Sequence, residues 1–150
     1  MRRIYCLTTA IAFALSLAAC DRAESPAETR EDVAEARQEA TEKVREEVAD
    51  AAEVRAEGAE EVAEQRSETD MDDVNDAQAE AMRDNAEAQY DVAIAQADAT
   101  QKVEKEKCDA LTGESRDACQ SAADAAFAAA KADASLKLDQ AKAVANAQDD

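Results

Sequence analysis

The sequence contains no histidine and no tryptophan, and it has only one proline, two glycines, two tyrosines and two phenylalanines. Without histidine it lacks the side chain that most often acts as a general base near neutral pH. Because proline and glycine are the residues that interrupt helices, their scarcity predicts long helices. Alanine supplies most of the 46% hydrophobic content and has little side chain to bury, so we expect a thin core.

The charge is strongly one-sided, with 36 acidic against 17 basic residues and a formal net charge of −19. This sign disfavours nucleic acid as a partner and predicts that helices project from an anionic membrane instead of lying on it. The carboxylates are spread over helical surfaces, with no partner base and no loop that has the oxygen spacing of a calcium site. We therefore expect no enzyme, no cofactor, no metal site and no small-molecule substrate.

The N-terminus reads MRRIYCLTTAIAFALSLAAC, with two arginines, an apolar run from about Ile4 to Ala19, and a tripeptide of small residues before the cysteine. This is the three-part form of a secretory signal, and it is too short for a membrane-spanning helix. Leu17-Ala18-Ala19-Cys20 resembles the lipobox of bacterial lipoproteins, in which cleavage precedes the cysteine and the cysteine is acylated. The alternative is ordinary cleavage nearby, for example after Ala18, which leaves Cys20 as a free thiol.

The lipoprotein resemblance implies that residues 1–19 are a lipoprotein signal peptide, that Cys20 is lipidated, and that residues 20–25 form a tether. More than one acyl chain would hold the protein on the membrane stably, because each buried methylene contributes ~0.8 kcal/mol. The mature chain would face the periplasm. In enterobacterial lipoproteins an aspartate after the lipidated cysteine favours the inner membrane, so Asp21 is the expected sorting residue, with the outer membrane as the alternative.

Export leaves Cys108 and Cys119 as an even pair in a compartment where disulfides persist. Gly113 and Glu114 lie midway between the two cysteines, so in an antiparallel helical hairpin that turns there Cys108 faces Cys119. Gly113 suits the left-handed residue that ends one helix, and Ser115 suits the N-cap of the next. The pattern predicts a structural disulfide, and closing a loop of this size contributes roughly 3 kcal/mol.

Two other uses of the cysteines are less favoured. A redox-active pair would want a CxxC-like spacing or a cationic setting, and the lysines and arginine near these cysteines are offset by acidic residues. A tetrahedral zinc site would need further ligands, and the sequence offers no histidine and no second cysteine pair in the mature chain.

The segment KVEKEKCDALTGESRDAC resembles a motif of small alanine-rich proteobacterial envelope proteins, of the form VAKEKCD, a short glycine-containing turn, then KDxC. The matching residues are Val103, Lys105, Glu106, Lys107, Cys108, Asp109, Gly113, Asp117 and Cys119, and Arg116 replaces the usual lysine. The resemblance covers roughly residues 90 to 135. It implies an exported helical protein and no activity. Relatives often repeat the motif and carry an ordinary signal peptide, whereas this chain has one copy and a lipobox.

A capping box formed by Ser25 and Glu28 predicts the start of an acidic amphipathic helix over residues 26–67. A break is expected over residues 67–70, with Thr69 or Asp70 as the cap of the next helix, although one continuous helix is the alternative. The first helix has a narrow apolar stripe, which consists of Val33, Ala36, Ala40, Val44, Val48, Ala51, Ala59 and Val62.

Residues 70–148 are predicted to form the disulfide-stapled hairpin. The first arm has two rows at seven-residue spacing, Val74, Ala81, Ala88, Ala95 and Gln78, Asn85, Val92, Ala99. We expect them to form a coiled-coil seam against the second arm, on the stripe Cys119, Ala123, Ala126, Ala130, Ala134, Leu138, Ala141 and Ala145. Phe127 should then lie against Thr100 and Val103, and Leu138 near Gln89 or Val92.

The sequence thus predicts an all-α fold of long amphipathic alanine-rich helices with a coiled-coil-like antiparallel hairpin. It leaves open whether the helix over residues 26–67 packs on the hairpin as a three-helix bundle. The expected function is that of a lipid-anchored periplasmic envelope protein with a structural, spacer or interaction role, whose partner is another envelope protein or a second copy. The alternative is a stress-related hydrophilic protectant that is largely disordered when dilute. Attachment to peptidoglycan through a C-terminal lysine is not expected, because the sequence ends in Asp149 and Asp150.

Overall fold

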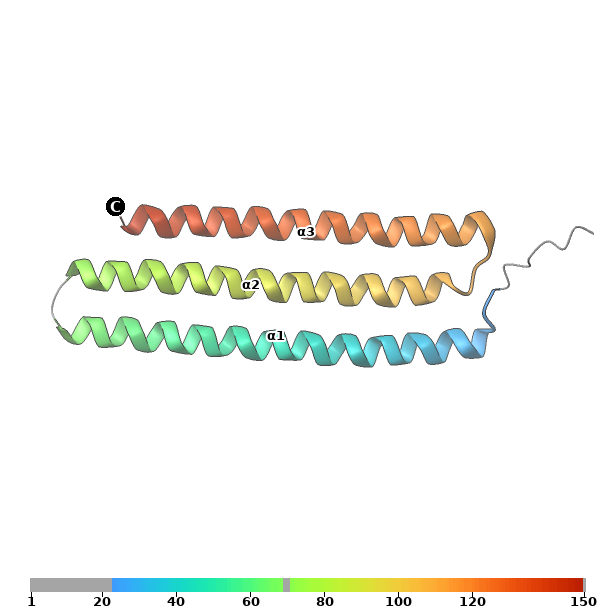
Figure 1. Ribbon diagram of the computed structural model, residues 1–150, viewed down its shortest axis with the longest axis horizontal. Coiled ribbons are helices and arrows are strands. Elements are labelled where there is room, and N and C mark those ends of the chain that lie inside the picture. Colours follow the sequence, from blue (N-terminus) through green and yellow to red (C-terminus); the bar gives the residue numbers. More distant parts are fainter. Residues whose placement is uncertain (1–22, 69–70, 150) are drawn as a thin grey trace, which may run out of the picture.

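The computed structural model describes residues 23–68 and 71–149, and within these ranges its regular secondary structure is entirely helical. The three helices are α1 (Pro26–Glu68), α2 (Met71–Cys108) and α3 (Gly113–Asp149). Neighbouring helices run antiparallel along most of the length of the molecule, so α1 and α3 point in the same direction (Figure 1). At a rise of 1.5 Å per residue, the 38 residues of α2 make a rod about 57 Å long. The predicted all-α fold is confirmed.

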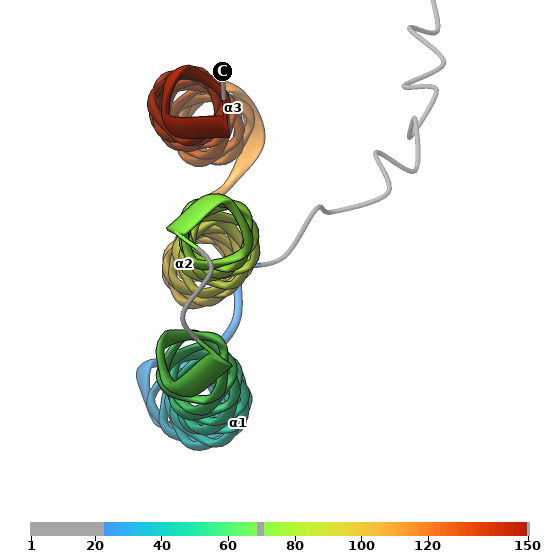
Figure 2. The same ribbon diagram turned by 90° about the vertical axis from the view of Figure 1, so that its left-hand side faces the viewer.

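The helices form an open three-helix bundle, in which α2 lies between α1 and α3. Viewed end-on, the three helices stand in a row (Figure 2). Helix α2 contacts both neighbours, whereas α1 and α3 do not contact each other. Helix α1 therefore packs on the hairpin, which answers the question that the sequence left open. It does so on the side of α2 away from α3, so the bundle is a flat layer with two broad faces.

The capping box at the start of α1 is present. The backbone N–H of Ser25 donates to Glu28 Oε2 at 2.9 Å, and the backbone N–H of Glu28 lies 3.3 Å from Ser25 Oγ. Helix α1 then runs without interruption to Glu68, one residue beyond the predicted end. The predicted caps of the next helix, Thr69 and Asp70, lie outside the described residues.

The core consists largely of alanine, as the composition predicts. The buried apolar residues are Ala36, Ala51, Val74, Ala77, Ala79, Ala86, Ala95, Cys108, Ala123, Ala134 and Ala145. Val48, which we expected in the buried stripe of α1, is 48% exposed, and Ala59 is also exposed. These two expectations were wrong because α1 has a neighbour on one side only, so a narrower strip of its surface is covered.

The row of α2 that contains Ala81 and Ala88 faces α1, and not α3 as predicted. A Cβ atom added at Gly58 of α1 would lie 2.8 Å from Ala81 Cβ, and Ala88 lines a hollow between α1 and α2. Helix α2 meets α3 with a different set of small residues, among them Ala86 and Ala97. A helix with neighbours on both sides needs two apolar strips, and the expectation of a single hairpin seam missed the second.

The register of the α2–α3 hairpin agrees with the prediction. Gln101 Nε2 donates to Asp124 Oδ1 at 2.7 Å, and at the far end Arg83 Nε donates to the side-chain oxygen of Asn146 at 3.0 Å. Both pairs lie within two residues of the register that places Cys108 opposite Cys119.

The predicted neighbours of the larger apolar side chains are mostly correct. Phe127 lines a hollow with Thr100, and Leu138 lines another with Gln89. Val103 lines a hollow between α2 and α1, and its predicted contact with Phe127 stays a prediction.

Candidate interaction surface and disulfide-linked turn

The predicted disulfide is present at the turn between α2 and α3. The Sγ atoms of Cys108 and Cys119 are 1.98 Å apart and their Cα atoms 5.6 Å apart. Cys108 is the last residue of α2 and is fully buried, and Cys119 lies in the second turn of α3. Because Cys108 is fully buried and Cys119 is half-buried, this disulfide between helix residues has little exposure, which favours the stapling role over a redox role.

The connection between α2 and α3, which the disulfide closes into a loop, is short and is held by hydrogen bonds. Gly113 has a φ of +54°, in the left-handed region that favours glycine, as predicted, but it begins α3 and does not end α2, which stops at Cys108. Ser115 does not have its predicted role, because α3 begins two residues earlier at Gly113 and Ser115 lies within the first turn. The sequence placed the start of α3 too late because serine is the more typical N-cap residue.

Arg116 braces the turn from the first part of α3. Its Nε donates to the carbonyl oxygen of Leu111 at 3.0 Å, and one of its terminal nitrogens lies 3.4 Å from the carbonyl oxygen of Asp109. A guanidinium group presents several donors in a fixed fork and can reach two carbonyls at once. The arginine that replaces the lysine of the resembled motif is therefore well suited to hold this turn.

The segment before α1 lies against the same end of the molecule. The backbone N–H of Glu24 donates to the carbonyl oxygen of Asp109 at 3.0 Å. Burial raises the pKa of the Glu24 carboxyl, and the carboxylates of Asp32 and Asp109 raise it further. Glu24, just before α1, thus lies beside the disulfide-linked turn.

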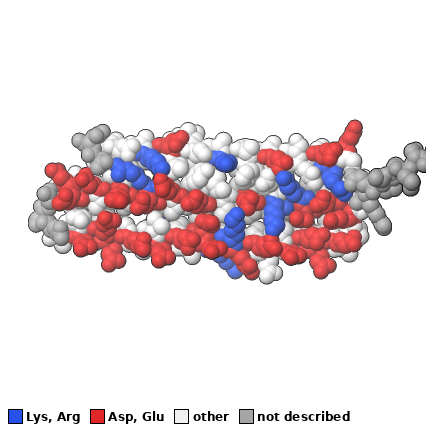
Figure 3. Space-filling view, viewed as in Figure 1, with Lys and Arg blue, Asp and Glu red and all other residues white. Residues whose placement is uncertain are grey.

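One broad face of the layer, which we call the acidic face, carries rows of carboxylates over α1 and α2 (Figure 3). Between these two helices is a hollow that includes the carboxylates of Glu47, Asp50, Glu57, Glu61, Asp84, Glu87 and Asp91. Like charges this close repel one another, so this face is unfavourable for another acidic surface.

Ion pairs on the acidic face join α2 to both neighbours. They comprise Lys43–Asp98 at 3.0 Å, Lys102–Glu39, Lys105–Asp124 at 2.6 Å and Lys142–Glu87 at 2.5 Å. Every partner is at least 38% exposed, and pairs of this kind each contribute about 0–1 kcal/mol. They fix the register of the helices more than they stabilise the fold.

The opposite face of α2 presents a row without charge, which we call the amide row. Its members follow alternating steps of four and three residues and therefore share one side of the helix. They are Gln78, Met82, Asn85, Gln89, Val92, Gln96, Ala99 and Val103. We call the broad face that contains this row the uncharged face.

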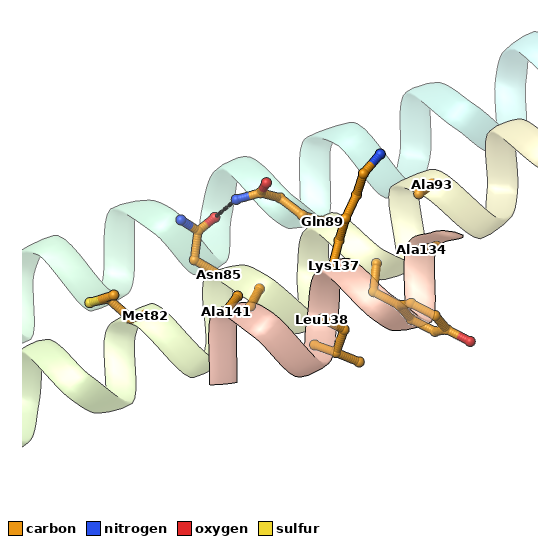
Figure 4. Close-up of a pocket in the computed structure, with 10 residues that line it drawn as sticks. Met82, Asn85, Gln89, Ala93, Ala134, Lys137, Leu138 and Ala141 are labelled. Carbon is orange, nitrogen blue, oxygen red and sulfur yellow. Dashed lines mark hydrogen bonds between the residues drawn. The ribbon is translucent and has the colours of Figure 1, made fainter. Parts of the chain in front are cut away.

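Two hollows between α2 and α3 open along this face. The first has a volume of about 400 Å³ and includes Asn85, Gln89 and Leu138, with Gln89 Nε2 donating to Asn85 Oδ1 at 3.0 Å (Figure 4). The second, of about 260 Å³, lies between Gln96 and Phe127.

A third hollow, of about 710 Å³, lies between α1 and α2 and is lined by Arg37, Val44 and Arg45 of α1. It shares Gln96 and Thr100 with the second hollow, so both open on the uncharged face. Glu104 lies at the end of this face near the disulfide, where it is paired with Lys107 at 2.6 Å. The amide row itself is thus uncharged and is bordered by hollows lined by alanine, amides and a few larger apolar side chains, while the charged residues of this face, among them Arg37, Arg45 and Lys137, lie at its edges.

No family model, no curated protein and no solved structure matches the chain. The resemblance to proteobacterial envelope proteins therefore stays a prediction.

The remaining predicted site residues lie outside the described ranges. These are the lipidation residue Cys20 and the sorting residue Asp21. None of the described helices is long and apolar enough to cross a membrane, and residues 23–68 and 71–149 hold no group of three or more ligand residues placed for a metal ion. The sequence analysis did not predict that α2 has one acidic face and one face with an uncharged row. The seven-residue repeat of uncharged residues was nevertheless present, in Gln78, Asn85, Val92 and Ala99.

Proposed function

We propose that this protein is a lipid-anchored periplasmic envelope protein that works as a rigid helical spacer and docking surface, without catalysis. The observation that carries this proposal is the hydrogen bond from Glu24 to Asp109, which joins the tether to one end of the bundle. An acylated Cys20 would then hold the rod by its disulfide-linked end, four residues before Glu24.

The shape of the bundle supports a spacer. A rod held at one end reaches about 57 Å from its attachment, because α2 rises 1.5 Å for each of its 38 residues. The C-terminal end of α1 and the N-terminal end of α2 lie at the far end from Glu24 (Figure 1). A partner at some distance from the membrane would meet that end or the flanks of the helices.

The charge distribution supports projection from the membrane. Rows of acidic residues run along α1 and α2 on the acidic face, and an anionic membrane surface repels them. Asp21 favours the inner membrane as the site of attachment.

The alternative, a hydrophilic protectant that is disordered when dilute, is supported by the thin alanine core and the high charge. The disulfide and the ion pairs between helices speak against it, because these contacts are useful only to a defined bundle. The scaffold is therefore the better account.

Lipidation is tested in Gram-negative cells that express the full chain and are fed an alkyne analogue of palmitate. We expect label on the wild-type chain, no label on the Cys20→Ser variant, and undiminished label on Cys6→Ser, whose altered residue lies in the signal peptide. The Cys20→Ser chain should also leave the membrane fraction. Label that persists in Cys20→Ser, or is missing from the wild type, would overturn the lipid anchor.

A second measurement separates the scaffold from the protectant. Circular dichroism of the chain in dilute physiological salt should give high helicity and a cooperative melt whose midpoint falls on addition of reductant. Low helicity that does not respond to reductant would favour the protectant.

A further inference from the structure

We infer that the uncharged face binds a second copy of this chain, and that the two layers pack face to face with parallel helices. In this arrangement the two-fold axis runs along the helices, so α2 lies over α2 of the other copy. The chemistry of the amide row, the size of the face and the distribution of charge support this arrangement.

The polar side chains of the amide row are suited to pair with themselves. A two-fold axis brings each residue of the central helix close to its own counterpart. A carboxylate can only accept hydrogen bonds, and an arginine can only donate them, so neither pairs with its own kind. An amide both donates and accepts, and Gln78, Asn85, Gln89 and Gln96 are all amides. The face opposite, with Asp84, Asp91 and Asp98 on α2, would place like charges together.

The spacing of the row matches what parallel helices require. Steps of four and three residues are the a and d positions of a heptad, which form the contact line between helices that lie side by side. Polar amides at such positions fix the register and the number of strands at some cost in stability. The amide row therefore has the pattern of a contact line, and it lies on one of the two broad faces of the layer that no helix of the same chain covers.

The uncharged face is large enough for a stable dimer. With helices packed 8–10 Å apart, a layer of three helices about 57 Å long has a footprint of roughly 1,500 Å². A standard stable interface buries about 800 Å² on each partner. Contact over little more than half of the face would reach that size.

Charge selects the parallel arrangement over the antiparallel one. Arg37 and Arg45 line the α1 edge of the face, while the α3 edge is lined mainly by alanine, with Lys137 paired to Asp133 at 2.6 Å. An antiparallel dimer would place the arginine edge of α1 over its own counterpart. In the parallel dimer the α1 edge lies over the α3 edge, and the arginines do not oppose each other.

The parallel arrangement also rests on the proposed function. It places both tethers at the same end, as two copies anchored in one membrane require. In the antiparallel arrangement the tethers would be separated by the length of the rod.

The test uses single added cysteines in the full chain, expressed with its own signal sequence and oxidised in intact cells with copper phenanthroline. Gln89→Cys lies in the amide row, and Asp91→Cys, two residues further along, lies on the acidic face; both positions are exposed. We expect a band at twice the mass of the chain on a non-reducing gel for Gln89→Cys and none for Asp91→Cys. Equal yields for the two variants, or no dimer from Gln89→Cys, would overturn the inference. A product of another mass would show that a different protein occupies the face.

A second variant guards against an effect of the added thiol alone. Asn85→Asp is nearly isosteric, and in the dimer it opposes two like charges, so adding it to Gln89→Cys should lower the cross-linking yield roughly tenfold or more. Adding Asp84→Asn on the acidic face should leave the yield unchanged. Helicity measured on the purified chains shows whether the bundle stays folded, and an undiminished yield in folded Asn85→Asp chains would contradict the inference.

The two proposals fail in different ways. Loss of the palmitate label overturns the anchor and leaves the cross-linking experiment valid on the unanchored chain. A labelled chain that does not cross-link through Gln89→Cys overturns the dimer and leaves the anchored scaffold in place.

Discussion

The two interfaces of α2 are built in different ways. Towards α3 it has a disulfide, and hollows lined by Phe127 and Leu138 remain along the interface. Towards α1 it has no covalent link among the described residues, and instead Gly58 allows the backbones to approach so closely that a Cβ atom there would lie 2.8 Å from Ala81 Cβ. A thin alanine core can thus be held either by a cross-link or by close approach of the helices.

The disulfide should have the largest effect on stability. Replacing Cys108 and Cys119 by serine removes the closure of the loop between them, which contributes about 3 kcal/mol to the free energy of unfolding. Because only the α2–α3 interface has this link, we expect α3 to lose hydrogen-exchange protection first, while α1 keeps most of its protection. Hydrogen exchange followed by mass spectrometry measures both helices in one sample. Equal loss in α1 and α3 would mean that the two interfaces form one cooperative unit.

The close approach at Gly58 should rank second. Gly58→Leu forces a large side chain against Ala81, and overpacking of this kind costs about 1–3 kcal/mol even though leucine is the better helix former. Here α1 should lose protection first, which reverses the result for the disulfide variant. Ala59→Leu is the matched control, because Ala59 is exposed and leucine there meets no neighbour helix. If the two leucine variants were equally stable in a denaturant titration, the close approach would not matter.

The sequence was sufficient to predict most of the α2–α3 interface. Two cysteines about a glycine-containing turn define a register, and Gln101–Asp124 and Arg83–Asn146 follow it. The sequence was insufficient to predict how α1 packs on α2. Alanine is small and frequent on every side of these helices, so periodicity alone could not assign the row of Ala81 to α1, and Gly58 looked like an interruption of the stripe instead of a contact.

The position of α1 also decided which surfaces remain open. A closed bundle would have covered Val48, whereas the flat layer leaves it 48% exposed. For the same reason the amide row of α2 has no partner helix within the layer. The row was visible in the sequence as a seven-residue repeat, but only the arrangement of all three helices shows that it lies on an open face.

The arginine at the disulfide-linked turn should have a smaller effect. Arg116→Lys keeps the charge but loses the fork that reaches the carbonyls of Leu111 and Asp109, and one hydrogen bond contributes about 1 kcal/mol. We expect a drop of this size in the free energy of unfolding, measured in denaturant, and faster exchange at the turn. Arg55→Lys, at an exposed arginine of α1, is the control and should be neutral. A neutral Arg116→Lys would show that lysine braces the turn equally well.

The smallest expected effect is an opposite response to acid at two places, the α2–α3 interface near Asp124 and the contact between Glu24 and the disulfide-linked turn. Hydrogen bonds from Lys105 and Gln101 lower the pKa of Asp124 despite partial desolvation, so its contribution is present above the unfolded pKa and is lost as pH falls through the folded pKa. Burial, with the carboxylates of Asp32 and Asp109, raises the pKa of Glu24. Its contribution is therefore present below the unfolded pKa and is lost as pH rises through the folded pKa.

Acidification from neutral pH should therefore loosen the α2–α3 interface near Asp124 while it tightens the contact between the tether and the turn. Chemical shifts of the Glu24 backbone amide and the Gln101 side-chain amide, followed by NMR from neutral to acidic pH, report the two ends of this comparison. Asp124→Asn should abolish the change at Gln101, and Glu24→Gln should abolish the change at residue 24, each without affecting the other. If both amides moved together in either variant, the acid response would belong to the bundle as a whole. The α2–α3 interface near Asp124 and the contact between Glu24 and the turn would then not respond to acid independently.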